Sequence, residues 1–91
     1  MDIDRLIIDV RETFEYELGH VEGAINVPLS ELSRDLTVLQ SFNKDSMIIV
    51  YCRTGSRANT SIKFLKKMGF TNLINGINVE NIENNLKLHN Y

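Results

Sequence analysis

Cysteine, long apolar runs and net charge are all scarce in this 91-residue chain. Cys52 is the only cysteine and His20 and His89 lie far apart, which excludes an internal disulfide and a Cys/His zinc cluster. The longest apolar run, 47–52, is far shorter than the roughly 20 residues that span a bilayer. The acidic start MDIDRLII is unlike a signal peptide. We therefore expect a soluble cytoplasmic protein with no membrane partner and no metal.

Length and composition are those of one small globular domain over residues 1–91, with 43% apolar and 24% charged residues. The net charge of −2 is unevenly spread, because residues 1–36 are mainly acidic and residues 37–73 carry six bases against Asp45 alone. This split fits solvated helix faces, or a positive potential in the middle of the chain that suits a small anion. Six bases with few aromatics between them do not predict a nucleic-acid partner.

Apolar periodicity alternates between strand and helix along the whole chain. Strands are expected at 5–10, 24–27, 47–51 and 71–74, and helices at 12–18, 31–39, 57–68 and 79–88. Phe14 and Leu18 share one face of the first helix, and Ser30 and Asn78 are candidate helix caps. Such alternation predicts an α/β fold with a small parallel sheet of about four strands flanked by helices.

Cys52 follows the most apolar strand, at the sheet edge where ligands bind in parallel α/β folds. Backbone N–H groups of a short loop, the start of the next helix, and Arg53 and Arg57 would all favour the thiolate over the thiol. Gly55 suits a loop that curls, because glycine accepts positive φ without steric cost. The plainer alternative is that Cys52 is a buried apolar filler.

Three segments together resemble the rhodanese family of sulfurtransferases. The loop Cys52-Arg-Thr-Gly-Ser-Arg57 is similar to that family's active-site loop. Residues 6–11 (LIIDVR), with Glu15-Tyr16, and residues 19–28 (GHVEGAINVP) resemble its other characteristic segments, in the same order and at similar spacing. The resemblance covers roughly residues 6–70, is greatest to the short single-domain thiosulfate sulfurtransferases, and implies a three-layer rhodanese-like fold.

The resemblance implies a mechanism without a cofactor. Cys52 would take the outer sulfur of a donor such as thiosulfate as a persulfide, and cyanide or a thiol, including a protein thiol, would then accept it. The loop residues would bind the small sulfur-containing anion; these are Arg53, Thr54, Gly55, Ser56 and Arg57. Arg53 and Arg57 would hold its sulfonate.

Other polar residues are expected to be structural. In relatives of this type, the residues that match Asp9 and Arg11 form an ion pair that supports the loop, and His20 would fix a turn by hydrogen bonding. A direct catalytic role is the alternative for each of them. Lys63, Lys66 and Lys67 fit a solvated helix face, or else a docking surface for an acidic sulfur acceptor.

Two other functions remain open. A carrier or sulfur- or redox-sensing module would form the persulfide but turn over little free thiosulfate. A small phosphatase or arsenate reductase would use a Cys-x5-Arg loop, whereas four residues separate Cys52 from Arg57 here. Residues 75–80 also depart from the family, because they have one glycine and no tryptophan. Asn75 and Asn78 tolerate a left-handed backbone and could form the turn there.

Overall fold

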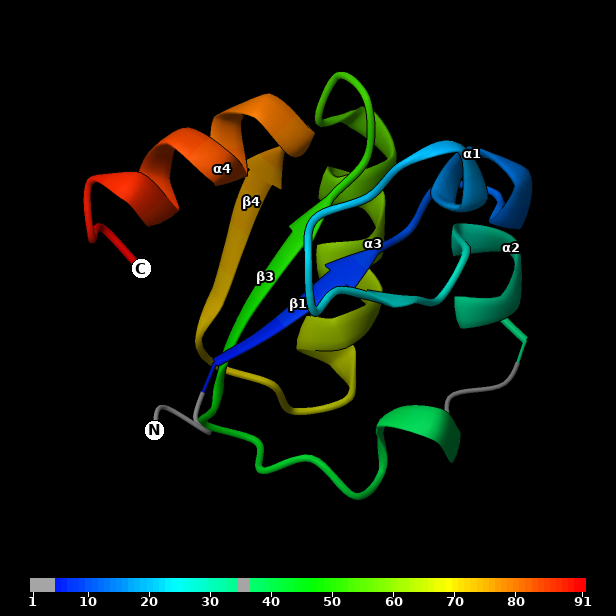
Figure 1. The fold of residues 1–91 in the computed structure, drawn as a ribbon. Coiled ribbons are helices and arrows are strands. Elements are labelled where there is room, and N and C mark those ends of the chain that lie inside the picture. The colour runs from blue at the N-terminus through cyan, green and yellow to red at the C-terminus, as the bar shows by residue number, and fades with distance from the viewer. Residues whose placement is uncertain (1–4, 35–36) are drawn as a thin grey trace.

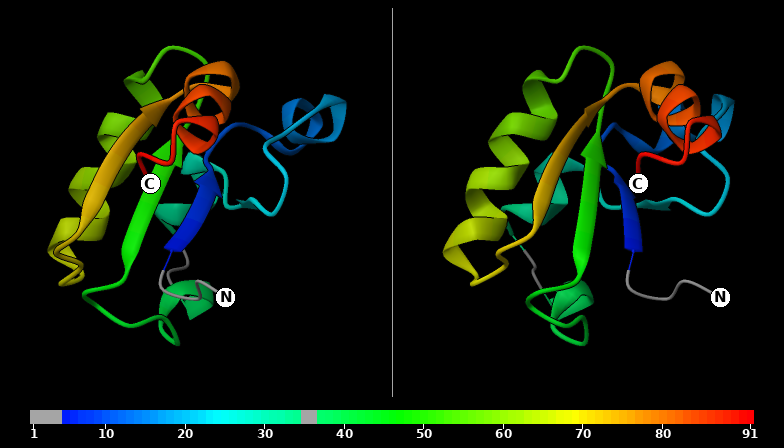
Figure 2. Two further views of the ribbon diagram at one scale, coloured as in Figure 1. Left: turned by 60° about the vertical axis from the view of Figure 1, so that its left-hand side comes forward. Right: turned by 90° about the vertical axis from the view of Figure 1, so that its left-hand side faces the viewer.

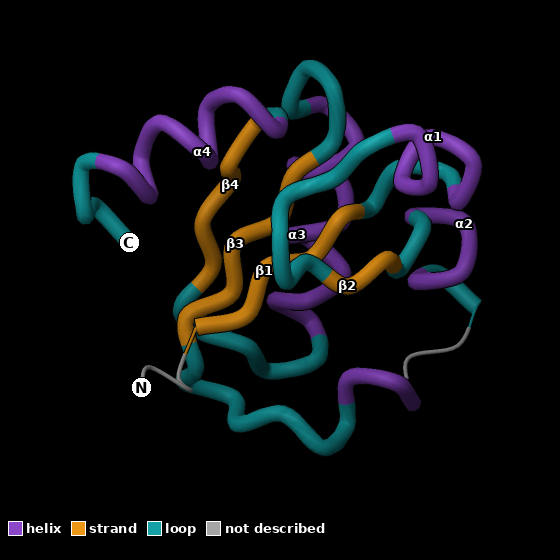
Figure 3. The backbone as a smooth tube through the Cα atoms, viewed as in Figure 1, coloured by secondary structure: helices purple, strands orange, loops and turns teal. Residues whose placement is uncertain are grey.

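A four-stranded parallel sheet forms the centre of the computed structural model, which describes residues 5–34 and 37–91. The strands are β1 (Arg5–Asp9), β2 (Ile25–Asn26), β3 (Met47–Tyr51) and β4 (Leu73–Ile77), in the order β2-β1-β3-β4. In Figures 1 and 3, β1, β3 and β4 start close together and run in the same direction, so their carboxyl ends lie along one edge of the sheet. The predicted α/β class and parallel sheet are confirmed.

Helices cover both faces of this sheet. They are α1 (Thr13–Leu18), α2 (Leu29–Leu32), α3 (Ser56–Lys67) and α4 (Val79–Lys87), with a 3-10 turn, η1, at Thr37–Leu39. Figure 2 shows α3 on one face and α4 on the other, as the expected three-layer arrangement requires. Within residues 5–34 and 37–91, no helix has the length and apolarity needed to cross a membrane.

Strand β3 lies between β1 and β4 and is buried on both faces. Ile48 and Val50 pack in the apolar cluster on the side of α2 and α3. Ile49 and Tyr51 pack in the second cluster, on the side of α4. Successive side chains of a strand point to opposite faces, so a strand buried on both sides reads as a continuous apolar run. The central position of β3 in the sheet therefore explains the continuous apolar run of residues 47–51.

Several helix ends are where the sequence places them. Helix α1 ends at Leu18 before Gly19, and the side chain of Asn78 accepts a hydrogen bond of 2.8 Å from the backbone N–H of Asn81 at the start of α4. Gly69 follows α3 with a φ of 102°, a left-handed conformation that favours glycine.

The helix expected at 31–39 is wrong as one continuous element. Helix α2 begins at Leu29 and ends at Leu32, so Ser30 lies inside it rather than capping it. The Ser33 hydroxyl donates to the Ser30 carbonyl at 3.1 Å and so competes with continuation of the helix. Leu39 lies in η1, and Leu36 lies outside the described residues.

The last strand was also expected too early, at 71–74. Strand β4 runs through Asn75 and Gly76, two residue types that are rare in strands, so the sequence pattern ends it before them. Pairing with β3 overrides that local preference, since Val50 pairs with Asn75 and Tyr51 with Ile77.

Gly76 is required by the close approach of α4 to the sheet. A Cβ at this position would lie 2.6 Å and 2.7 Å from two carbons of the Ile82 side chain and 2.9 Å from Ile49. Both isoleucines are fully buried, so neither can move aside without disturbing the core.

We expect Gly76→Ala to lower the free energy of unfolding by about 1–3 kcal/mol, the usual cost of overpacking a core. Urea denaturation monitored by circular dichroism measures the change. Asn84→Ala, on the exposed side of α4, is the control and should change it by no more than about 0.5 kcal/mol. Equal stability of the two variants would show that the contact with Ile82 is not constraining.

Candidate functional site

Cys52 lies directly after β3, at the carboxyl edge of the sheet. The loop that follows rises beyond the end of β3 and leads into α3 (Figure 1). The Cys52 backbone N–H donates to the carbonyl of Ile77 at the end of β4, at 3.1 Å. Two neighbouring strands therefore fix the backbone from which the sulfur projects.

The Cys52 sulfur accepts a hydrogen bond of 3.1 Å from the backbone N–H of Gly55. Burial raises the pKa of the thiol, whereas the backbone N–H groups of Ala58, Thr54, Gly55 and Arg57 lower it, and their combined effect places the pKa below its ordinary value. Gly55 has a φ of 92°, which a residue with a side chain rarely adopts. The loop therefore turns its amides toward the sulfur because glycine stands at this position.

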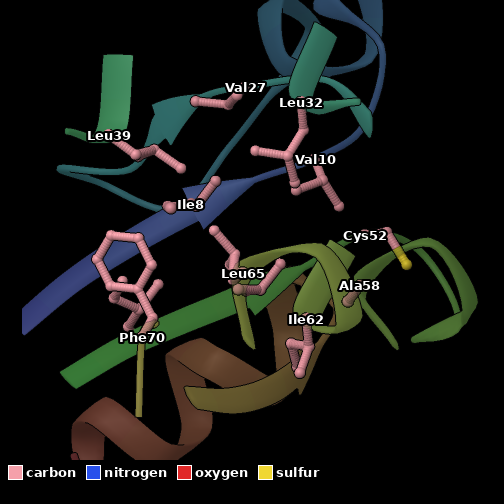
Figure 4. Packing of buried hydrophobic residues seen from close by; sticks show 12 residues of the cluster. Ile8, Val10, Val27, Leu32, Leu39, Cys52, Ala58, Ile62, Leu65 and Phe70 are labelled. Atoms are coloured by element: carbon pink, nitrogen blue, oxygen red, sulfur yellow. The ribbon is translucent and has the colours of Figure 1, made fainter. Parts of the chain in front are cut away.

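Cys52 is also a member of the core, with 1% of its surface exposed. It belongs to the apolar cluster that contains Val10, Leu32 and Ala58. Figure 4 shows its sulfur turned away from Val10 and Leu32 and toward the loop. An apolar filler would explain the burial, but it would not explain the convergence of amides that favours the ionised sulfur.

Arg57, in the first turn of α3, forms a two-point ion pair with Glu15 of α1. Its two terminal nitrogens lie 2.7 Å and 3.1 Å from the two carboxylate oxygens. Hydrogen bonding to Arg57 lowers the pKa of Glu15 to about 2, and the same contact raises the pKa of Arg57. The charge of Arg57 is thus largely balanced by Glu15, although Arg57 was expected to hold an anion.

Arg53 is exposed beside the same loop. Within the described part of the chain, no carboxylate lies within ion-pair distance of its guanidinium. It lines a groove of about 330 Å³ together with α1 residues that include Phe14 and Leu18. Phe14 and Leu18 are 65% and 85% exposed. The face of α1 that they share, as the sequence predicts, therefore borders this groove and not the core.

Thr54 and Ser56, the remaining expected binding residues, are exposed around the loop. The N–H of Thr54 is among the groups that favour the Cys52 thiolate. Ser56 is the first residue of α3, so the loop between strand and helix is one residue shorter than expected. Their role in binding an anion stays a prediction.

Asp9 and Arg11 form a buried ion pair at the end of β1. Two nitrogens of the Arg11 guanidinium donate to both carboxylate oxygens, the shortest contact being 2.7 Å, and Arg11 also donates to the Gly19 carbonyl at 2.6 Å. This carbonyl follows α1, so the pair ties the end of β1 to the end of the helix that carries Glu15. The guanidinium carbon of Arg11 also lies 5.5 Å from the centre of the buried Tyr51 ring.

His20 lies outside this site. One ring nitrogen, Nδ1, is 2.8 Å from the Tyr16 carbonyl, and the ring stacks on that of Tyr16 with centroids 3.6 Å apart. These two contacts with Tyr16 hold the turn that follows α1. Among the described residues, no group of three His, Cys, Asp or Glu side chains is arranged to hold a metal ion.

Sequence reasoning missed two residues that touch the loop, Glu15 and Asn75. Glu15 stands in the Glu-Tyr segment, and its negative charge was the signal for a partner among the arginines. The Asn75 side chain donates to the Gly55 carbonyl at 3.0 Å. This contact joins residues 20 positions apart. The only sign of it in the sequence is that residues 75–80 depart from the family pattern.

We expect the Glu15–Arg57 pair to stabilise the fold above pH 4.5 and to lose this contribution as the pH falls toward 2. The reason is that the folded-state pKa of Glu15 is about 2, against an ordinary value of 4.5, so acid protonates the unfolded carboxylate first. The difference in unfolding free energy between the wild type and Glu15→Gln, measured by urea denaturation at a series of pH values, should shrink across this range. A difference that does not change with pH would contradict the pairing.

Comparison with known proteins agrees with this fold. The family model of the rhodanese-like domain matches residues 1–78. A solved structure described as rhodanese with anions from E. coli is 31% identical, with a TM-score of 0.74, and the match covers 85% of this chain and 89% of that one.

Two curated relatives are longer proteins. The "Putative sulfur carrier protein YrkF" of Bacillus subtilis (strain 168) is 36% identical over 69 residues, which are 76% of this chain and 36% of that protein. The tRNA uridine(34) hydroxylase of Photorhabdus laumondii is 36% identical over 73 residues, 77% of this chain and 21% of that protein. The chain thus spans about a third and a fifth of these relatives.

Proposed function

Because the chain belongs to the family of rhodanese-like domains, we propose that it transfers sulfur by way of a persulfide on Cys52. The observation that carries this proposal is the loop in which backbone N–H groups favour the Cys52 thiolate despite its burial. A thiolate, unlike a thiol, is a strong nucleophile. No cofactor is needed for loading the sulfur onto Cys52 or for passing it to an acceptor.

In the first step the Cys52 thiolate attacks the outer sulfur of thiosulfate. A new S–S bond forms between Cys52 and the outer sulfur. The bond between the two sulfur atoms of thiosulfate breaks, and sulfite leaves with its electron pair. Cys52 then carries a persulfide whose outer sulfur is negative. The amides of the loop, among them the N–H groups of Thr54 and Gly55, would stabilise this charge.

In the second step a nucleophile removes the outer sulfur. Cyanide attacks it to give thiocyanate, or a thiolate attacks it to give a new persulfide, and in each case the Cys52 thiolate is restored. Each step conserves charge and needs no oxidant. Arg53 supports the first step most directly, because it is a cation beside the loop without an acidic partner within ion-pair distance among the described residues.

Treatment with thiosulfate should add one sulfur atom to the intact protein. Mass spectrometry should detect this gain, its loss on adding cyanide, and its absence in Cys52→Ser. Full thiosulfate-to-cyanide activity in Cys52→Ser would contradict the proposal. Saturable, Cys52-dependent hydrolysis of an aryl phosphate would favour a phosphatase instead.

A persulfide carrier is the second candidate, favoured by the match to a protein described as a putative sulfur carrier. A carrier would load stoichiometrically but release sulfur to a protein thiol faster than to free cyanide. Comparing the rates at which these two acceptors discharge the preloaded persulfide separates the candidates. Efficient turnover with cyanide favours the enzyme.

We expect Arg53→Ala to raise the KM for thiosulfate about tenfold, since a hydrogen bond to a charged group is worth about 1.5 kcal/mol or more. Steady-state kinetics of thiocyanate formation measures this change. Lys67→Ala is the matched control, because it removes the same charge from the last turn of α3, at the end opposite the loop. An equal effect of the two substitutions would show that only overall charge matters.

A further inference from the structure

Strand β4 ends in a tight turn with unusual backbone geometry. Ile77 has a φ of 72°, and the N–H of Asn78 donates to the Gly76 carbonyl at 2.9 Å. A hydrogen bond between residues two apart, around a residue with positive φ, defines a γ-turn of the rare, strained type. The strain is greater for a β-branched residue such as isoleucine. The turn was expected to place left-handed backbone at Asn75 or Asn78, but it places it at Ile77.

This turn helps to hold the backbone of Cys52 in place. The pairing of β3 with β4 shifts between Val50 and Tyr51, so that Gly76 is an extra residue in β4. Such a bulge re-aims the backbone that follows it. Here the Ile77 carbonyl is aimed at the Cys52 N–H, with a separation of 3.1 Å.

One side chain, Asn75, joins the turn to the loop. Its Oδ1 accepts a hydrogen bond of 2.9 Å from the N–H of Ile77, and its Nδ2 donates to the carbonyl of Gly55 at 3.0 Å. The N–H of Gly55 in turn donates to the Cys52 sulfur at 3.1 Å. A Cβ on Gly55 would lie 3.6 Å from the Asn75 amide, which is an ordinary van der Waals distance, so the two residues are neighbours in space.

We propose that Asn75 is a positioning residue of the sulfur-transfer loop, which clamps Gly55 to the end of β4 so that its N–H stays directed at Cys52. This inference rests on the proposed role of Cys52. It adds a residue for which the resemblance supplied no role. The side chain acts through Gly55, because the hydrogen bond to the sulfur comes from the Gly55 N–H.

Asparagine suits this position because one short planar amide supplies both a donor and an acceptor. An aspartate would keep the acceptor for the Ile77 N–H but would lose the donor to Gly55 and set a carboxylate against its carbonyl. An alanine would lose both hydrogen bonds. The two substitutions therefore separate support of the turn from support of the loop.

The test measures how fast iodoacetamide alkylates Cys52 across a range of pH in the full chain. In Asn75→Ala we expect the apparent pKa of the thiol to rise by roughly half a unit to one unit, the size expected from one hydrogen bond. In Asn75→Asp we expect at least as large a rise, with the turn preserved, because the donor to Gly55 is lost and the added negative charge also opposes the thiolate. The kcat for sulfur transfer should fall in both, while the KM for thiosulfate changes less than twofold.

Asn78→Ala is the matched control. The Asn78 side chain caps α4 by accepting a hydrogen bond from the N–H of Asn81, and no hydrogen bond joins it to the described residues of the loop. It should lower the melting temperature without moving the thiol pKa. A thiol pKa in both Asn75 variants equal to that of the wild type would overturn the inference, and so would an unchanged pKa in Asn75→Asp alone if Asn75→Ala does not fold.

The inference and the proposed function fail in different ways. An ordinary thiol pKa in the wild type, with no persulfide after thiosulfate treatment, would remove the proposed function itself. If the thiol pKa is lowered in the wild type and the Asn75 substitutions do not change it, only the proposed role of Asn75 is contradicted.

Discussion

Ionisation of one buried sulfur is the constraint on which the rest of the site depends. Burial of Cys52 opposes a negative charge, because a charge loses its hydration in the interior. The backbone N–H groups of the loop replace the lost water with fixed dipoles and favour the thiolate. These donors come from the peptide backbone, so the chemistry depends on the shape of the loop more than on its side chains.

Three elements hold that shape from different sides. Strand β4 holds Cys52 through the Ile77 carbonyl and Gly55 through Asn75. Helix α3 begins at Ser56 and contributes N–H groups from its first turn. Helix α1 contributes Glu15, which engages Arg57. The shape of the loop therefore depends on tertiary contacts, although the residues of the loop are consecutive in the sequence.

Local signals were sufficient to predict the parallel sheet and the place of Cys52, because the apolar run of β3 and the helix signals at Gly19, Gly69 and Asn78 act over short distances. Contacts across the chain could not be predicted in this way. The ion pair of Arg57 with Glu15 spans 42 residues, and the positive φ of Ile77 contradicts the preference of that residue type. The expected extents of α2 and β4 were wrong because hydrogen bonds of Ser33 and strand pairing overrode the sequence pattern.

The most direct measurement is the titration of the Cys52 Cβ by carbon-13 NMR, in protein labelled at cysteine. Because the chain has one cysteine, a single resonance reports the ionisation of this thiol. We expect a midpoint clearly below about 8.5, the ordinary value for cysteine, and the loss of the titrating signal when thiosulfate converts the thiol to a persulfide. A midpoint at or above 8.5 would contradict it, because burial would then outweigh the amides of the loop.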